Sequence, residues 1–291
     1  MDRTAQTISL PDGRALGFAE YGPPDGFPVI GFFGAGARLM RPPDDQTSAA
    51  GVRLITAERP GFGLSSPQPG RRLLDWPADV AALADALGLG RFAIVGASQG
   101  GPYAMACAYA LQERLSVVGL ISSLAPFEAP GVLEGMARQL RLLPVIARRM
   151  PWLLLLSQKL AAPMARRNPA RLIRAMFRGL PPNDAAVLAS HPAVNPIFLH
   201  DAPEIYRQGG AGVAADIQLV THPWGFRLED IRAPVLLWQG EDDRNVPPAM
   251  GRYLARAIPG CQATFVPDAG HFMIYARWQE LLGRLKEAAG A

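Results

Sequence analysis

The chain has few cysteines and no long apolar run, and each shortage excludes a class of protein. Its 291 residues include two cysteines, Cys107 and Cys261, too few for a disulfide framework, which indicates a reducing compartment. The apolar run Trp152–Leu156 in the middle of the chain is far shorter than the roughly 20 residues that a membrane span requires. The first residues do not join a basic stretch to an apolar one, as a signal peptide would. We therefore expect a soluble, cytoplasmic protein.

Histidine and cysteine residues nowhere have the spacing of metal ligands, so we predict no metal site and no cofactor. The net charge of +4 invites comparison with nucleic-acid-binding proteins. The positive charge is concentrated, since nine arginines and Lys159 lie between Arg138 and Arg178 without any Asp or Glu. We interpret this segment mainly as a solvated surface, with an anionic ligand or an anionic membrane as the alternative. Neither a nucleic-acid partner nor membrane contact is expected.

Short apolar runs alternate with helical patterns along most of the chain. This alternation predicts an α/β protein with a mostly parallel central sheet flanked by helices. Strands are expected at 14–22, 27–33, 51–58, 91–96, 116–122, 233–240 and 262–267. Helices are expected at 76–89, at 99–115, from about 247, and after 271.

The alternation stops between residues 126 and 215. This segment consists of helical pieces separated by prolines, with almost no strand-like pattern. A helical insertion into a regular α/β pattern is typical of a lid over a core. We predict a core formed by residues 1–125 and 216–291, and a helical cap formed by residues 126–215.

The sequence "GASQGG" places Ser98 between Gly96 and Gly100, after an apolar strand and before a helix. A strand that turns sharply into a helix forces strained geometry on the residue at the turn, and side chains two positions away would collide. The turn lifts the hydroxyl to the carboxyl end of the sheet. The amide of Gln99 then faces the bound group at the start of a helix, where negative charge is favoured. Ser98 is thus the candidate nucleophile.

A serine hydroxyl needs a base and an acid that orients the base. Of the four histidines, His191 and His200 lie in the inserted segment and His222 in "THPWG", whereas His271 stands between the last strand and the last helix. We predict His271 as the general base. The acid is expected in "GEDDRNVPP", where Asp243 has the typical spacing; Asp242 is the second choice and Glu128 a distant third.

These motifs together resemble the α/β-hydrolase fold family. The resemblance rests on "DGRALGFAEYG", "AERPGFGLSSP", "GASQGG", "LLWQGEDDRNVPP" and "DAGHF", and covers nearly the whole chain outside the insertion. The order of the three candidates, Ser98, Asp243 and His271, is the family order. In the family, "RPGFG" (59–63) forms a structural turn beside the site. Aspartate-nucleophile relatives are excluded, because this chain carries a serine.

The resemblance also implies an oxyanion hole, with one departure from the family pattern. Relatives usually carry His-Gly after the third strand, and here Phe33 stands where the histidine would lie. If Gly34 matches the family glycine, the backbone amides of Ala35 and Gln99 are the donors, and a backbone donor tolerates the exchange. The exchange removes the hydrogen bond that the histidine would make within this loop. Arg38 is interpreted as part of a surface salt bridge, with an anion site as the alternative.

The expected activity is that of a serine hydrolase that cleaves a carboxylic ester or a related acyl bond through an acyl-enzyme on Ser98. A thioester, a lactone or a carbon–carbon bond next to a carbonyl is included. Apolar residues of the insertion favour a small-molecule substrate with a medium-sized apolar acyl group, although they could equally attach the cap to the core. The alternatives are a cofactor-free perhydrolase or haloperoxidase-like enzyme, and a ligand-binding protein without turnover. The oligomeric state does not follow from the sequence.

Overall fold

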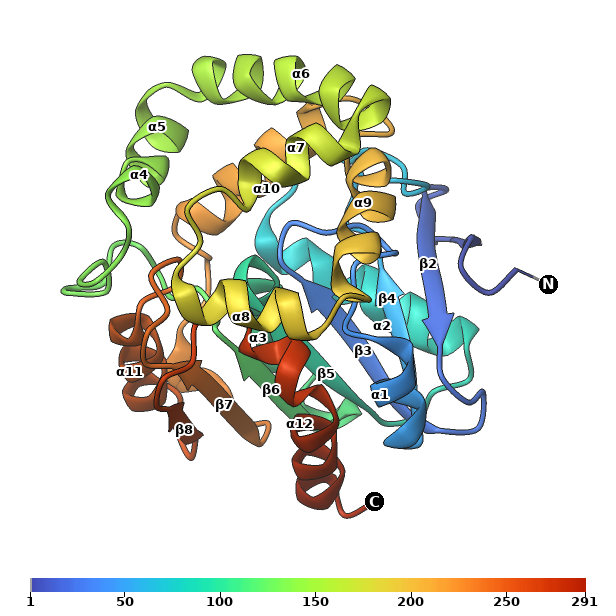
Figure 1. Ribbon diagram of the computed structural model, residues 1–291. Coiled ribbons are helices and arrows are strands. Elements are labelled where there is room, and N and C mark those ends of the chain that lie inside the picture. Colours follow the sequence, from blue (N-terminus) through green and yellow to red (C-terminus); the bar gives the residue numbers. More distant parts are fainter. Residues whose placement is uncertain (1) are drawn as a thin grey trace.

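The computed structural model describes residues 2–291, which are built around one sheet of eight strands (Figure 1). The strands are β1 (Gln6–Ser9), β2 (Ala15–Tyr21), β3 (Phe27–Phe33), β4 (Val52–Ala57), β5 (Phe92–Ala97), β6 (Leu115–Ile121), β7 (Val235–Gly240) and β8 (Gln262–Val266). They lie in the order β1-β2-β4-β3-β5-β6-β7-β8. The pairs β1–β2 and β2–β4 are antiparallel, and all other neighbours are parallel. The mostly parallel sheet predicted from the sequence is confirmed.

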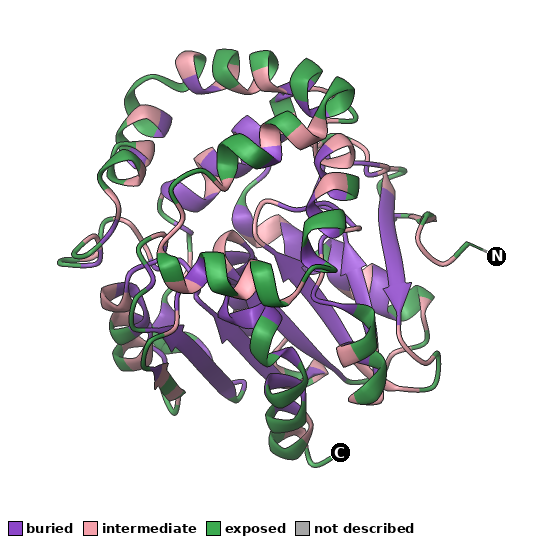
Figure 2. Ribbon diagram, viewed as in Figure 1, coloured by how far each residue is buried: buried purple, intermediate pink, exposed green. Residues whose placement is uncertain are grey.

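The seven predicted strands are present, and β1 is the strand that the prediction missed. Its four residues lie at the edge of the sheet and alternate between half-buried and exposed, so they form no apolar run. The central strand β5, by contrast, is buried at every position, as expected for a parallel strand covered on both faces (Figure 2).

Helices cover both faces of the sheet. On one face lie α2 (Trp76–Ala86), α3 (Gly101–Ala110) and α11 (Pro248–Ala257); on the other lie α1 (Asp44–Ala49) and α12 (Met273–Ala289). Short 3₁₀ turns are η1 (Leu73–Asp75), η2 (Ser98–Gly100), η3 (Gln112–Arg114) and η4 (Leu228–Asp230). The helix predicted over 99–115 is wrong in its last part: it ends at Ala110 because Leu111 leaves the helical conformation and the chain enters β6 four residues later.

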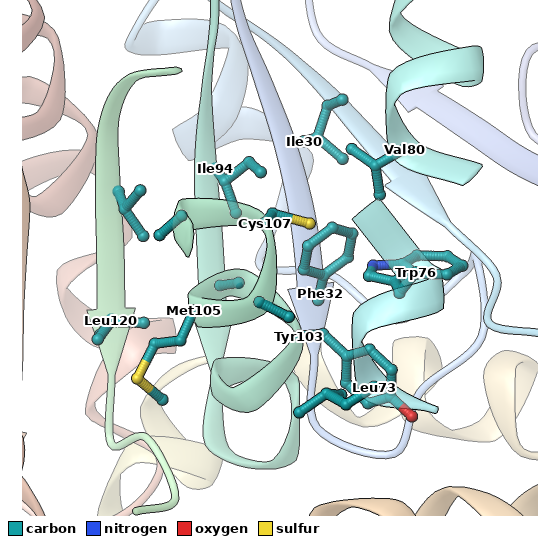
Figure 3. Packing of buried hydrophobic residues seen from close by; sticks show 14 of the residues in the cluster. Ile30, Phe32, Leu73, Trp76, Val80, Ile94, Tyr103, Met105, Cys107 and Leu120 are labelled. Atoms are coloured by element: carbon teal, nitrogen blue, oxygen red, sulfur yellow. The ribbon is translucent and has the colours of Figure 1, made fainter. Parts of the chain in front are cut away.

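Aromatic side chains lock α2 and α3 onto the sheet. Phe32 of β3 meets Trp76 edge to face with ring centroids 5.5 Å apart, and Trp76 meets Tyr103 of α3 in the same way at 5.9 Å (Figure 3). All three rings are buried. The hydroxyl group of Tyr103 lies at the rim of this apolar cluster (Figure 3), where it donates a hydrogen bond to Asp216.

Seven helices lie between β6 and β7. They are α4 (Arg138–Arg141), α5 (Leu143–Arg149), α6 (Pro151–Arg167), α7 (Pro169–Met176), α8 (Pro182–Ser190), α9 (Val194–Ile205) and α10 (Ala211–Thr221). Each helix from α5 to α8 has a proline in one of its first two positions, where the missing N–H costs nothing. Residue 215, the predicted end of the insertion, falls inside α10 rather than in a loop.

This helical segment stands over one edge of the sheet. Residues that directly follow β3, β5 and β6 line one cavity together with residues of α7, α9 and α10. The helices therefore cover the carboxyl ends of the parallel strands, where ligands bind in open α/β sheets. Among residues 2–291, no helix combines the length and the apolar character needed to cross a bilayer.

Candidate active site

Ser98 stands on a sharp turn between β5 and α3. Its φ angle of 54° lies in the left-handed region, which a serine adopts only where the surrounding chain enforces it. A Cβ atom on Gly96 would lie 2.6 Å from the Cβ atom of Ala104, and one on Gly100 would overlap the carbonyl oxygen of Phe32. Glycine is therefore required on both sides of the serine for the strand and the helix to approach so closely.

Asp243 follows β7 and His271 follows β8, so adjacent parallel strands bring both side chains to the same edge. Nδ1 of His271 lies 2.8 Å from Oδ2 of Asp243. A carboxylate can only accept, so Nδ1 carries the proton and Nε2 is left free to act as a base. The other oxygen of Asp243 accepts hydrogen bonds from the amides of Asn245 and Val246 at 2.8 and 2.9 Å. With both oxygens bound, the carboxylate is fixed toward the imidazole.

The surroundings of His271 favour its charged form. Burial alone would lower the pKa of His271, because it disfavours the imidazolium. The charge of Asp243, its hydrogen bond and the charge of Asp184 act in the opposite direction and prevail, so the pKa is raised above its ordinary value of 6.5. Asp184, on α8, is buried and accepts a hydrogen bond from the amide of Phe272 at 2.8 Å. Burial raises the pKa of Asp184 itself.

The other acids and histidines weighed in the sequence lie away from Ser98. Asp242 is exposed and accepts a hydrogen bond from Asn183 at 2.7 Å, and Glu128 is exposed and pairs with Arg148 at 3.0 Å. Of the four histidines, His271 shares a cavity with Ser98, whereas three do not: His191, His200 and His222.

The loop after β3 brings further backbone amides to the serine. Gly34 has a φ angle of 53° and donates its amide to the carbonyl oxygen of Ala97 at 3.0 Å, which ties this loop to the residue before Ser98. Within residues 2–291, the amide of Ala35 donates to no acceptor. Gln99 lies in the first helical turn, where amides have no partner in the helix. Ala35 and Gln99, the two residues predicted to form the oxyanion hole, both line the cavity that contains Ser98.

Phe33 and Arg38 flank this loop, and both are buried. The ring of Phe33 packs edge to face on Trp278 of α12, with centroids 5.8 Å apart, so an apolar contact stands where relatives have a histidine. Nη1 of Arg38 lies 2.7 Å from Glu58 and 2.6 Å from Glu204. The prediction of a surface salt bridge for Arg38 is therefore wrong: the side chain turns inward because the fully buried Glu58 requires a cation.

Two buried side chains, Arg59 and Asp201, hold the loop after β3 through hydrogen bonds to its backbone. The guanidinium group of Arg59, from the "RPGFG" turn, donates to the carbonyl oxygens of Gly34 and Gly36 at 3.0 and 3.3 Å. Asp201, on α9, accepts hydrogen bonds from the amides of Ala37 and Leu39 at 2.9 and 3.0 Å. Asp201 is fully buried, and burial raises its pKa to about 7. Both sides of the loop are thus fixed by buried side chains.

A third buried aspartate of the helical segment, Asp216 of α10, contacts the turn that carries Ser98. Its Oδ2 accepts a hydrogen bond from Nε2 of Gln99 at 2.7 Å. Its Oδ1 lies 2.9 Å from Nη2 of Arg71 and 3.1 Å from Nε of Arg59, and also accepts a hydrogen bond from the hydroxyl of Tyr103. Because Arg59 also holds the loop after β3, Asp216 connects the two segments that provide the free amides.

Three buried aspartates of the helical segment therefore contact three different parts of the site. Asp184 supports the loop of His271, Asp201 supports the loop of Ala35, and Asp216 holds Gln99. The sequence analysis missed all three. The available signal was an isolated acid among apolar neighbours, as in "AADIQLV" around Asp216, which is typical of a buried carboxylate with a specific partner.

The cavity above Ser98 has a volume of about 400 Å³ and an apolar lining. No Asp, Glu, Lys or Arg is among the residues that line it, so apart from the titratable His271 its polar side chains are uncharged. The hydroxyl group of Ser122, at the end of β6, is buried in the lining and has no partner within residues 2–291. No group of three potential metal ligands occurs in this part of the chain. Apolar lining residues include Met40, Leu172, Ile173, Met176, Phe177, Phe198 and Ile205.

A parallel sheet that is covered on both faces and raises a serine above its carboxyl edge places the protein in the α/β class. The sequence profile of the alpha/beta hydrolase family matches residues 26–284, and the chain belongs to this family. The predicted fold and family are thereby confirmed.

Solved structures share this fold over almost the whole chain. A hydrolase from Pseudomonas aeruginosa has a TM-score of 0.72 and 21% identity, and covers 99% of this chain and 98% of its own. The enol-lactonase from Burkholderia xenovorans has a TM-score of 0.69 and 19% identity, with 98% and 100% covered. Among curated proteins, the non-heme chloroperoxidase of Streptomyces lividans is 33% identical over 126 residues. That match spans 41% of this chain and 45% of the chloroperoxidase, less than half of either protein.

Proposed function

We propose that the protein is a serine hydrolase that cleaves an ester or a related acyl bond, with Ser98, His271 and Asp243 as its catalytic residues. The hydrogen bond between His271 and the buried Asp243, beside the cavity of Ser98, carries this proposal. It leaves a neutral Nε2 available to take the serine proton.

The reaction follows from the positions of these groups. The oxygen of Ser98 attacks the carbonyl carbon while Nε2 of His271 accepts the proton, and Asp243 stabilises the imidazolium. The amides of Ala35 and Gln99 stabilise the negative charge that develops on the carbonyl oxygen. The imidazolium then protonates the leaving group, and a water molecule activated by His271 releases the acid from the serine. The helices α4–α10 act as the cap that excludes bulk water.

The lining of the cavity supports an uncharged, apolar acyl group as the substrate. A carboxylate or an ammonium group buried there would lose its hydration without finding a permanent opposite charge, because no Asp, Glu, Lys or Arg lies in the lining and His271 acts in its neutral form. Phe177, the residue after α7, and Phe198 of α9 meet edge to face at 5.1 Å and provide an aromatic wall. An acyl chain of medium length would bury its methylene groups against this wall.

Hydrolysis of p-nitrophenyl esters of graded chain length tests the proposal. We expect kcat/KM to rise with chain length until the cavity is filled, and Ser98→Ala to reduce turnover to the background rate. Unchanged turnover in Ser98→Ala would exclude this serine as the nucleophile. Labelling of Ser98 by a fluorophosphonate without turnover of any ester would favour the non-catalytic, ligand-binding alternative.

A second candidate function is perhydrolysis, which is favoured by the partial match to a non-heme chloroperoxidase. The same acyl-enzyme would form, and hydrogen peroxide instead of water would attack it to give a peracid and free Ser98. Halogenation of monochlorodimedone in the presence of an uncharged acetate ester, peroxide and bromide would detect the peracid. Perhydrolysis faster than ester hydrolysis would favour this candidate.

A further inference from the structure

Helices α4–α7 and the loops beside them carry a concentration of positive charge. Between Arg138 and Arg178 there are ten basic residues and no acidic one. The whole chain has a net charge of +4, so the remainder of the chain is net acidic. Within residues 2–291, Arg148 is the one member of this group that forms an ion pair, with Glu128. The other nine have no acidic partner in this part of the chain and can meet an external anion.

The outer face of α6 is also apolar. Trp152, Leu156, Leu160 and Met164 are spaced four residues apart and so follow one face of the helix. Trp152 is 63% exposed and Leu160 is 69% exposed. The opposite face is buried against the other helices of the segment, so the outer face is a separate feature rather than part of the core. Exposed basic residues beside the apolar stripe are Lys159, Arg166 and Arg167.

The same surface continues over α4 and α5. Leu142, Val145 and Met150 are all exposed, and they lie next to exposed arginines. In Figure 1, α4, α5 and α6 form an arc on the side of the molecule that faces away from the sheet, and Figure 2 shows mostly exposed positions along it. Apolar side chains gathered in this way on the outside of a protein indicate a partner. We call this face of α4–α6 the basic apolar surface.

We propose that the basic apolar surface binds the surface of a lipid bilayer that contains anionic headgroups. Trp152 and the leucines of α6 would enter the headgroup region, while the flanking arginines and Lys159 remain level with the phosphates. A second copy of the chain fits less well, because a two-fold contact would place one unneutralised basic face against another. Nucleic acid would neutralise the arginines and leave the aliphatic stripe in water. The sequence analysis interprets this segment mainly as a solvated surface and expects no membrane contact, so the proposal departs from that expectation.

The tryptophan content of the chain gives a direct assay that does not depend on enzymatic activity. Trp152 is exposed, whereas the other four tryptophans are at most 6% exposed: Trp76, Trp224, Trp238 and Trp278. With vesicles of equal parts phosphatidylglycerol and phosphatidylcholine, we expect a blue shift of tryptophan emission and cosedimentation of the protein. Binding should fall when salt is added, and should be much weaker with pure phosphatidylcholine.

Two variants separate the apolar contribution from the charged one. Leu156→Gln with Leu160→Gln keeps the helix propensity and the reporter Trp152, and should weaken vesicle binding on the order of tenfold or more. Arg166→Gln with Arg167→Gln should weaken it by on the order of tenfold, and should reduce the salt dependence. The matched control, Arg227→Gln with Arg284→Gln, changes two exposed arginines outside this surface. It should alter vesicle binding by less than about twofold.

Three results would overturn the proposal. One is binding to anionic vesicles that is no tighter than binding to phosphatidylcholine. Another is an equal loss of binding in the control variant, which would indicate a response to net charge alone. The third is a dimer in light scattering that becomes a monomer in the Leu156→Gln, Leu160→Gln variant, since a second copy of the chain would then cover this face.

Discussion

Replacing Asp216 with asparagine tests whether one buried carboxylate holds both parts of the proposed oxyanion hole. Asparagine has the same shape, and it can still pair with Gln99 once the Gln99 amide rotates. It cannot neutralise Arg59 and Arg71, which are 2% and 8% exposed. The change therefore removes one charge and leaves two buried guanidinium groups without their anion.

The contacts of Asp216 set the expected size of the loss in stability and of the loss in kcat. Leaving a buried ion-pair partner uncompensated costs roughly 3–5 kcal/mol of unfolding free energy, which is about 6–10 °C in Tm for a chain of this size. Arg59, no longer held by Asp216, would also loosen its bonds to the carbonyl oxygens of Gly34 and Gly36. Complete loss of one oxyanion donor costs on the order of 10²–10³ in kcat. We expect Asp216→Asn to lose on the order of ten- to a hundredfold in kcat, a part of that effect.

The measurement is kcat and KM with a p-nitrophenyl ester at a temperature well below the Tm of the variant. Asp79→Asn is the matched control, because Asp79 is 4% exposed, accepts hydrogen bonds from Arg14 at 2.9 and 2.6 Å, and does not line the cavity. It should lose stability and keep its kcat. If Asp216→Asn loses stability and keeps kcat within about twofold of wild type, as the control does, Asp216 is structural alone and the reasoning is wrong.

Three further outcomes follow from the same contacts. Activity requires neutral His271, so kcat/KM should rise with pH through a midpoint above the ordinary pKa of 6.5. Asp184→Asn removes a neighbouring negative charge and should move the midpoint of this pH–rate profile downward. Gly100→Ala should lower the free energy of unfolding in urea by about 3 kcal/mol or more, because its Cβ would overlap the carbonyl oxygen of Phe32. The control Gly283→Ala has open space around the new Cβ and should not destabilise the protein. In the folded protein the pKa of Asp201 is about 7, above its ordinary value of 3.8, so the native state binds a proton that the unfolded state releases. The free energy of unfolding should therefore fall as pH rises from about 4 to 7, and Asp201→Asn should reduce this slope in urea unfolding.

The parts of the site that could be predicted from the sequence are those fixed by local geometry or by chain order. Ser98 was identifiable because the strand, the two flanking glycines and the following helix are contiguous, and the φ angle of 54° is the consequence of that local arrangement. Asp243 and His271 were candidates because each follows one of two successive strands, and parallel strands end at a common edge. Their hydrogen bond could not be read from the sequence, but their proximity could.

The rest depends on contacts between residues far apart in the chain. Ala37 meets Asp201 across 164 positions, and Gln99 meets Asp216 across 117 positions, and no periodic pattern encodes either contact. The prediction for Arg38 fails for the same reason: an arginine in a loop is usually solvated, and the buried carboxylate that draws it inward, Glu58, lies in a different loop, directly after β4.

The three buried aspartates restrict how the helical segment between β6 and β7 can move. A lid that only covered a cavity would need apolar contacts with the core, and its movement would leave the reacting groups undisturbed. Here α8, α9 and α10 each place a buried carboxylate on the backbone or side chain of a different site loop. Breaking any of these contacts exposes an unpaired polar group, so the segment cannot open as one rigid body without disturbing the proposed catalytic groups. Movement that admits substrate should therefore be confined to α4–α7, the helices that carry no such contact. Met176, the last residue of α7, lines the cavity and is 53% exposed, so it lies where substrate would enter.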